Sequence, residues 1–150
     1  MGLLAGVNYD PAAAVSKATS SLLAMTAFDT TNLRLVFTVP TNGAVLVRMQ
    51  TCLLGATTFP QVLLGVLEGS TVKGRQVPKA SLSATALATT TVPLEACFLV
   101  TGLTPAASLT WDAAYGVEIV LASTNIKYGG PNDTTTTNAW GGFAYEIWDT

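Results

Sequence analysis

The sequence predicts an all-β protein, and three observations carry the prediction. From residue 31 onward, apolar residues recur at every second position in short runs, which is the period of a strand with one buried face. Gly, Pro and Asn separate these runs at close intervals. No helical pattern alternates with the runs, so a parallel α/β sheet is not expected. About seven to nine short strands of this kind indicate a single-domain antiparallel β-sandwich.

The N-terminal residues 1–30 differ from the rest because they are rich in Ala and Ser and do not alternate. Asp10 and Pro11 are placed like the N-cap and first residue of a helix, and apolar residues follow at helical spacing as far as Met25. An extended arm that lies on a neighbouring subunit is the alternative, and both stay open. We expect residues 1–30 to be an arm or short helix that mediates docking, and residues 31–150 to be the sandwich domain.

The first two runs of the sandwich domain are expected to form an antiparallel hairpin with one solvated face. Between residues 32–39 and 44–52, the dipeptide Asn42-Gly43 is the strongest short-range hairpin signal. Arg48 and Gln50 then lie on the solvated side. The side chains expected to face inward are Leu33, Leu35, Phe37, Val39, Val45, Val47 and Met49.

The middle of the chain supplies a buried strand followed by a basic loop. Residues 61–68 are a continuous apolar run, which is typical of a strand buried on both faces. Glycines and a proline punctuate residues 69–78, where the basic side chains cluster. This cluster either meets an acidic partner surface or is a solvated loop. Its members are Lys73, Arg75 and Lys79.

The last third of the chain contains further short strands. Residues 81–92 are either a weak strand or a long loop, and residues 129–137 read as a polar loop. Trp140 stands in the Gly-rich sequence Asn-Ala-Trp-Gly-Gly, and an aromatic residue in such a setting favours an interface over the core. The expected strands are 94–101, 108–111 before Asp112, 115–123 and 143–148.

The length of the strand region separates two kinds of sandwich. A jelly roll has eight strands and fits about 120 residues, whereas an immunoglobulin-like domain fits about 100. Residues 31–150 therefore favour the jelly roll over the immunoglobulin-like fold.

The composition points to assembly with other chains. Only 11% of the residues are charged, against about 25% in typical soluble domains. The surface must therefore be covered largely by small and neutral polar residues, which protect a monomer poorly against association. We expect much of this surface to be buried against other chains, and a neutral, Thr-rich monomer is the alternative.

The sequence lacks the residues that most catalytic and metal-binding sites need. The chain has no histidine, and its two cysteines, Cys52 and Cys97, form no CxxC pattern, so we expect free thiols and no metal site. The nine carboxylates offer no preferred pair for acid–base work. We expect no catalytic residue, no cofactor and no enzyme activity. A net charge of −2 without a basic stripe argues against nucleic acid, and no long apolar stretch indicates a membrane span.

Several stretches taken together resemble small tailed-bacteriophage virion proteins of the head decoration, or cement, type. The resemblance implies a jelly roll that forms a homotrimer on capsid symmetry axes and docks on the major capsid protein. It also implies a virion location after assembly in the bacterial cytoplasm. The stretches are residues 3–11, 37–43, 61–68, 103–115 and 127–133, followed by the aromatic C-terminus.

The alternative is a phage fibre, spike or tail component that binds a saccharide or protein on the host surface. Under either hypothesis the candidate residues belong to an interface and not to a catalytic site. Two come from the N-terminal segment, two from the basic cluster and one from the Gly-rich sequence. They are Tyr9, Pro11, Lys73, Arg75 and Trp140.

Overall fold

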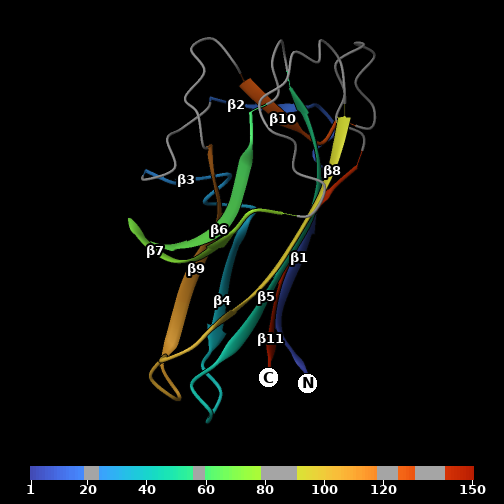
Figure 1. The fold of residues 1–150 in the computed structure, drawn as a ribbon. Coiled ribbons are helices and arrows are strands. Elements are labelled where there is room, and N and C mark those ends of the chain that lie inside the picture. The colour runs from blue at the N-terminus through green and yellow to red at the C-terminus, as the bar shows by residue number, and fades with distance from the viewer. Residues whose placement is uncertain (19–23, 56–59, 79–90, 118–124, 131–140) are drawn as a thin grey trace.

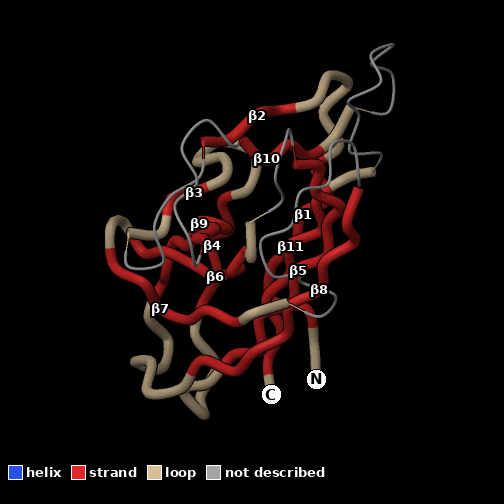
Figure 2. The backbone as a smooth tube through the Cα atoms, turned by 45° about the horizontal axis from the view of Figure 1, so that its top comes forward, coloured by secondary structure: helices blue, strands red, loops and turns tan. Residues whose placement is uncertain are grey.

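The computed structural model describes residues 1–18, 24–55, 60–78, 91–117, 125–130 and 141–150. Within these residues the strands form two antiparallel sheets (Figure 1), and Figure 2 shows them joined by loops without a helix. Sheet A contains β1 (Leu3–Tyr9), β2 (Val15–Ala18), β5 (Val45–Gly55), β8 (Thr91–Val100), β10 (Asn125–Tyr128) and β11 (Phe143–Asp149). Sheet B contains β3 (Thr26–Ala27), β4 (Arg34–Thr38), β6 (Val62–Glu68), β7 (Thr71–Gln76) and β9 (Ser108–Val117). The prediction of an antiparallel β-sandwich is confirmed.

The path of the chain is that of a jelly roll. The order of the principal strands is β1-β11-β5-β8 in sheet A and β4-β9-β6-β7 in sheet B. Along the chain these strands alternate between the two sheets, except where β6 and β7 form a hairpin. This is the eight-stranded double Greek key, so the preference for a jelly roll over an immunoglobulin-like sandwich is confirmed. The short strands β2, β3 and β10 extend the two sheets.

The turn at Asn42-Gly43 does not make the hairpin that its residues predict. A tight turn is present, because Gly43 has a φ of +66° and its N–H donates to the Pro40 carbonyl at 3.0 Å. However, β4 pairs with β9 in sheet B, whereas β5 pairs with β8 and β11 in sheet A. The turn carries the chain from one sheet to the other. The residues of a turn fix the local bend, and they do not fix which sheet each flanking strand joins.

The core lies between the sheets and is formed by the inward side chains of both. Phe28 lies among the rings of Tyr115, Tyr128 and Phe143, with centroid distances of 4.7, 5.6 and 4.8 Å. The alternation predicted for β4, β5 and β11 is confirmed, because their inward side chains are buried. They are Leu33, Leu35, Phe37, Val39, Val45, Val47, Met49, Phe143, Tyr145 and Ile147.

The N-terminal segment is extended, so the helix alternative for residues 11–25 is wrong where the structure describes them. β1 pairs with β11, and β2 pairs with β10. Asp10-Pro11 stands at the bend between these strands, where the Pro11 carbonyl accepts the Gly130 N–H at 2.9 Å. The Asp-Pro pair therefore marks a bend and not a helix start. Contact between this segment and a neighbouring subunit stays a prediction.

The pairing of β1 makes the N-terminal segment part of the sandwich. Leu4, Ala5, Val7 and Tyr9 pack against the core cluster, and β1 covers one edge of β11. Removing residues 1–30 would expose that edge and part of the core. A deletion is therefore not expected to leave the sandwich intact, so docking by this segment needs point substitutions as its test.

Two further expectations need correction, and one strand was not expected. Residues 71–76 of the expected basic loop form β7, the edge strand that pairs with β6. The strand expected to end before Asp112 continues as β9 to Val117, and it includes the start of the strand expected at 115–123. β10 carries too short a pattern to have been anticipated. The interpretations of residues 81–90, 118–123 and 131–137, and of Trp140, lie outside the described residues.

Candidate functional site

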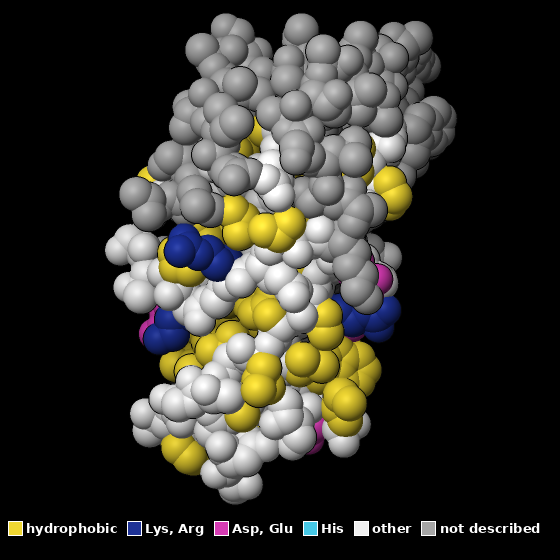
Figure 3. Space-filling view, in the orientation of Figure 1, with side chains coloured by type: hydrophobic (Ala, Val, Ile, Leu, Met, Phe, Trp, Pro, Cys, Tyr) yellow, Lys and Arg dark blue, Asp and Glu magenta, His cyan; other side chains and the backbone are white. Residues whose placement is uncertain are grey.

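The outer face of sheet A carries a row of four large apolar side chains on adjacent strands. The strand register places Leu3 opposite Trp148, Trp148 opposite Leu46, and Leu46 opposite Leu99. Leu3 is 54% exposed and Leu99 is 56% exposed, whereas Leu46 and Trp148 are half-buried. Figure 3 shows hydrophobic side chains on the surface of the lower half of the molecule, the half in which Figure 1 places the two chain ends. We call Leu3, Trp148, Leu46 and Leu99 the apolar row.

A hollow adjoins the middle of the apolar row, between Trp148 and Leu46. Its volume is about 200 Å³, and it is lined by Met1, Leu46, Arg48 and Trp148. The N-terminus is held beside it, because the Met1 ammonium lies 3.6 Å from the Asp149 carboxylate and the Gly2 N–H donates to the same carboxylate. At one end of the row, Leu99 projects from β8, which pairs with β5.

The next outward-facing position along β11, β5 and β8 forms a second row, which we call the charged row. Glu146 lies opposite Arg48, and Arg48 lies opposite Cys97. The indole Nε1 of Trp148 donates to Glu146 at 2.9 Å, which fixes the orientation of the ring in the apolar row. Arg48 Nε lies 3.9 Å from Glu95 Oε1, and both side chains are about 40% exposed. The face therefore presents both signs of charge beside its apolar part.

A polar groove of about 570 Å³ lies beyond the charged row on the same face. Asn8, Ala144, Gln50 and Glu95 stand side by side across its floor on β1, β11, β5 and β8. Gly142 makes room for Asn8, because a Cβ at Gly142 would lie 2.6 Å from Asn8 Oδ1. Cys52 and Pro93 also line the groove.

Both cysteines are free thiols on this outer face, as expected from the sequence. Cys97 is exposed, and Cys52 is half-buried beside the groove. Burial raises the pKa of the Cys52 thiol, which keeps it neutral at physiological pH. Cys52 therefore contributes a neutral group to the groove and not a reactive thiolate.

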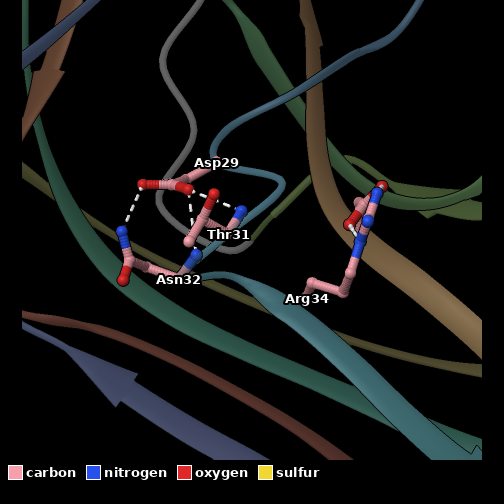
Figure 4. A network of polar contacts seen from close by, with 5 residues as sticks. Asp29, Thr31, Asn32 and Arg34 are labelled. Atoms are coloured by element: carbon pink, nitrogen blue, oxygen red, sulfur yellow. Dashed lines mark hydrogen bonds and ion pairs between the residues drawn. The ribbon is translucent and has the colours of Figure 1, made fainter.

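The outer face of sheet B is organised around a different ion pair. Arg34 donates from Nε and Nη2 to the two carboxylate oxygens of Asp112, at 2.7 and 2.9 Å (Figure 4). Asp29 accepts the backbone N–H groups of Thr31 and Asn32 and the side-chain amide of Asn32. Burial of Asp29 acts to raise its pKa, and these hydrogen bonds outweigh burial and lower the pKa. Both arrangements stabilise the fold at the start of β4.

The five candidate interface residues are not brought together on one face. Tyr9 packs against the core, with its ring 6.4 Å from that of Tyr128. Pro11 lies against Gly129, where a Cβ would stand 2.3 Å from its Cγ. Lys73 and Arg75 lie on the edge strand β7 of sheet B, and Trp140 lies outside the described residues. Their role in an interface stays a prediction.

The basic cluster has a structural contact of its own. Lys73 Nζ lies 3.2 Å from Glu68 Oε2, and the same carboxylate accepts the indole N–H of Trp111 at 3.1 Å. Hydrogen bonds from Trp111 and then from Lys73 lower the pKa of Glu68. Lys73 thus links the edge strand to the end of β6, while Arg75 is exposed.

The apolar row was missed in the sequence, although a signal for it is present. In β5 and β8 the inward residues alternate as expected, but Leu46 and Leu99 occupy the parity reserved for polar side chains. Trp148 does the same in β11. Apolar residues on the outward parity of three strands mark a face that is not simply solvated. Only the strand register reveals that they are neighbours.

Two findings concern other classes of site. Among the described residues, no group of three or more His, Cys, Asp or Glu side chains is placed to hold a metal ion. The described part of the chain also contains no helix with the length and hydropathy required to cross a bilayer.

Comparison with known proteins gives no related sequence and a distant structural similarity. No protein-family model matches the chain, and no curated protein matches it. Among solved structures, the chain is similar to the crystal structure of the infectious bursal disease virus VP2 subviral particle, with a TM-score of 0.31 and 8% sequence identity. The match covers 97% of this chain and 37% of that one, so the chain spans little more than a third of the length of the protein it matches.

Proposed function

We propose that the chain is a structural virion protein: a cement protein that decorates a bacteriophage capsid, forms trimers and binds the major capsid protein. The observation that carries the proposal is the apolar row, which lies open on the outer face of a jelly-roll sheet. The proposal assigns the chain no reaction, cofactor, nucleic acid or membrane. It places the protein in the virion after assembly in the cytoplasm of the host bacterium.

Exposure of the apolar row is unfavourable until a partner covers it. Apolar surface in contact with water costs about 25 cal/mol per Å², and a contiguous apolar patch on a soluble protein marks an interaction site. The rest of the surface offers little electrostatic repulsion against association, because only 11% of residues are charged. A protein that works by lasting contact with other proteins accounts for both features.

The fold is consistent with the resemblance noted in the sequence. Phage decoration proteins of this size often resemble jelly rolls, and the strand order of this chain is that of a jelly roll. The two termini lie side by side at one end of the sandwich (Figure 1), where the Asp149 N–H donates to the Gly2 carbonyl at 2.9 Å. This hydrogen bond extends the pairing of β1 and β11 to the ends of the chain beside the apolar row, and a preorganised face favours tight docking.

The test of the proposed function is the composition of purified particles. Phage particles from the bacterium that makes the chain are banded by density and analysed by quantitative mass spectrometry. We expect the chain at a fixed copy number relative to the major capsid protein, and particles that lack it should bind the purified chain to the same ratio. Absence from banded particles, together with no binding to them, contradicts the proposal.

A second candidate function is supported by the polar groove. The groove offers the amides of Asn8 and Gln50 and the carboxylate of Glu95 in one line, groups that hydrogen-bond to hydroxyls. Its volume of about 570 Å³ lies within the range of ligand sites. These features favour a fibre or spike component that binds a neutral saccharide of the host surface.

The second function is separated from the first by glycan binding. A glycan array probed with the purified chain should give a signal that Gln50→Ala reduces, while Val36→Ala on the outer face of sheet B leaves it unchanged. An array without signal, in a chain that is present on heads at fixed copy number, excludes the second function in favour of the first.

A further inference from the structure

We propose that the apolar row is the contact between copies of this chain, with Leu99 of one copy seated in the hollow beside Trp148 of the next. This inference rests on the proposed function, because it names the partner of the surface that carries that function. The proposed function requires contacts both with the capsid and between copies, and it does not say which contact uses which face.

The positions of the two rows along the strands favour a second copy of the chain as the partner. The apolar row occupies one level along the strands of sheet A, and the charged row occupies the next outward level. When copies of one chain pack with their strands alongside a common axis, equal levels meet. The apolar rows then form a single dry layer, and the charged rows form a layer above it.

The charges on this face are also self-complementary. The charged row carries Arg48 and the carboxylate of Glu146. A second carboxylate, that of Glu95, stands at the next outward position along the strands and pairs with Arg48. Arg48 is 43% exposed, and its Nε is 3.9 Å from Glu95, so the guanidinium has room for another carboxylate. A second copy supplies both signs at the same level. A partner of one charge sign would match one part of the row and repel the other, and an anionic membrane would be repelled by the two carboxylates.

The shape of the row favours a ring of copies over a face-to-face pair. Leu99 projects at the end of the row on β8, whereas the hollow of about 200 Å³ lies in the middle of the row, between Leu46 on β5 and Trp148 on β11. A projection and a hollow at different places on one molecule make a contact in which each copy uses two different patches. Such a contact closes into a ring when the rotation permits, and a trimer is one such ring.

The test compares two exposed apolar residues on opposite sheets. Leu99 is 56% exposed on the outer face of sheet A, and Val36 is 60% exposed on the outer face of sheet B. The mass of the full chain is measured by light scattering after size exclusion over a range of concentrations. We expect a trimer for the wild type and for Val36→Asp. Leu99→Asp is expected to weaken association by about 100-fold, because it places a charge in the dry layer.

A second readout reports directly on the face and does not depend on mass. Cys97 is exposed in the single chain and lies two residues before Leu99 on β8. In the assembled protein its alkylation by N-ethylmaleimide should be at least about tenfold slower than in Leu99→Asp. Circular dichroism of Leu99→Asp checks that the sandwich remains folded. If this variant unfolds, Leu99→Ser is expected to give the same loss of mass with a normal spectrum.

The outcomes separate the inference from the proposed function. A wild-type chain that is monomeric at every concentration, or equal loss of assembly in Val36→Asp and Leu99→Asp, overturns the inference. A monomer that binds capsids through Leu99 overturns the inference and leaves the proposed function standing. A dimer that Leu99→Asp dissociates supports the self-contact and contradicts the trimer. A trimer that never joins a particle supports the self-contact and contradicts the proposed function.

Discussion

The outer face of each sheet carries a group of apolar side chains, and the described chain covers only one of the two groups. On sheet B, Leu67 and Ala114 point outward and are nevertheless buried, because Met25 packs against them from the segment before β3. On sheet A, the described part of the chain leaves Leu3 and Leu99 more than half exposed. The chain therefore covers one apolar patch itself and leaves the other open. This contrast supports the proposal that the open patch is an interface.

The packing of Met25 over Leu67 and Ala114 on sheet B depends on a glycine. Gly65 lies in the middle of β6, and a Cβ there would stand 2.8 Å from the Met25 methyl and 2.5 Å from the Gly74 carbonyl oxygen. The absence of a side chain at this position lets Met25 approach the sheet closely. On the outer face of sheet A, Trp148 and Leu46 instead line an open hollow, which no described residue covers. Substitutions on the two faces should therefore have different consequences.

The largest effect is expected from filling the space at Gly65. Gly65→Val should lower the free energy of unfolding by about 3 kcal/mol, because the new side chain displaces Met25 and meets the backbone of β7. Urea unfolding followed by tryptophan fluorescence measures the loss. The matched control is Gly69→Ala in the β6–β7 turn, where φ is +60° and the space is open. This control should cost only about 1 kcal/mol, and equal losses would contradict the role of Gly65.

Truncation of Met25, which covers the apolar group on sheet B, is the next test. Met25→Ala should cost about 2 kcal/mol of unfolding free energy, since Met25 is 9% exposed and its loss uncovers Leu67 and Ala114. Leu99→Ala should cost less than about 0.5 kcal/mol at low protein concentration, because Leu99 is 56% exposed in the single chain. The cost of Leu99→Ala should grow with protein concentration, as association stabilises the wild type. Equal losses of unfolding free energy for Met25→Ala and Leu99→Ala at low concentration would contradict the difference between the two faces.

The ion pairs of the two faces offer a third contrast. Arg34→Met should lower the unfolding free energy more than Arg48→Met does, because it leaves the carboxylate of Asp112, which is 5% exposed, without its guanidinium. Arg48→Met should cost less than about 0.5 kcal/mol in the single chain, since both members of that pair are well exposed. Urea unfolding at low concentration measures both values. A larger loss for Arg48→Met would show that the Arg48–Glu95 pair stabilises the sandwich itself.

Much of the fold could be predicted because alternation is a local property. The inward residues of β4, β5 and β11 follow from the period of two, and the jelly roll was favoured on length alone. The partners of each strand are not local, so the Asn42-Gly43 turn was assigned to a hairpin. Asp112 was read as the end of a strand because its partner, Arg34, lies 78 residues away in sequence.

The candidate site was harder to predict for the same reason. Each member of the apolar row is an unremarked residue in its own strand, and the row exists only through the pairing of four strands. β7 was read as a loop because Gly74 suggested a turn. Its place in a strand is explained by Phe98 of β8, whose ring would lie 2.7 Å from a Cβ at Gly74. The glycine thus admits a side chain from the other sheet.

Sheet A is unusual on its inner face as well as its outer face. Tyr145 of β11 points into the core, and no described residue lies within hydrogen-bonding distance of its buried hydroxyl. Tyr115 of sheet B provides the contrast, because its hydroxyl donates to the Ala18 carbonyl. Tyr145→Phe should therefore raise the unfolding free energy by about 1 kcal/mol, and Tyr115→Phe should lower it by a similar amount.

The dependence of stability on pH sharpens this last contrast. Burial raises the pKa of Tyr145, with a smaller contribution from the charge of Asp112, while a tyrosine in the unfolded chain ionises near pH 10. Above about pH 10 the unfolded state binds fewer protons than the folded state, so the unfolding free energy falls as the pH rises. Tyr145→Phe should make this alkaline decline shallower in urea unfolding measured between about pH 9 and pH 11. An unchanged slope would mean that Tyr145 ionises in the folded protein as readily as in the unfolded chain, and Tyr128, whose hydroxyl is also buried, would then be the group to test.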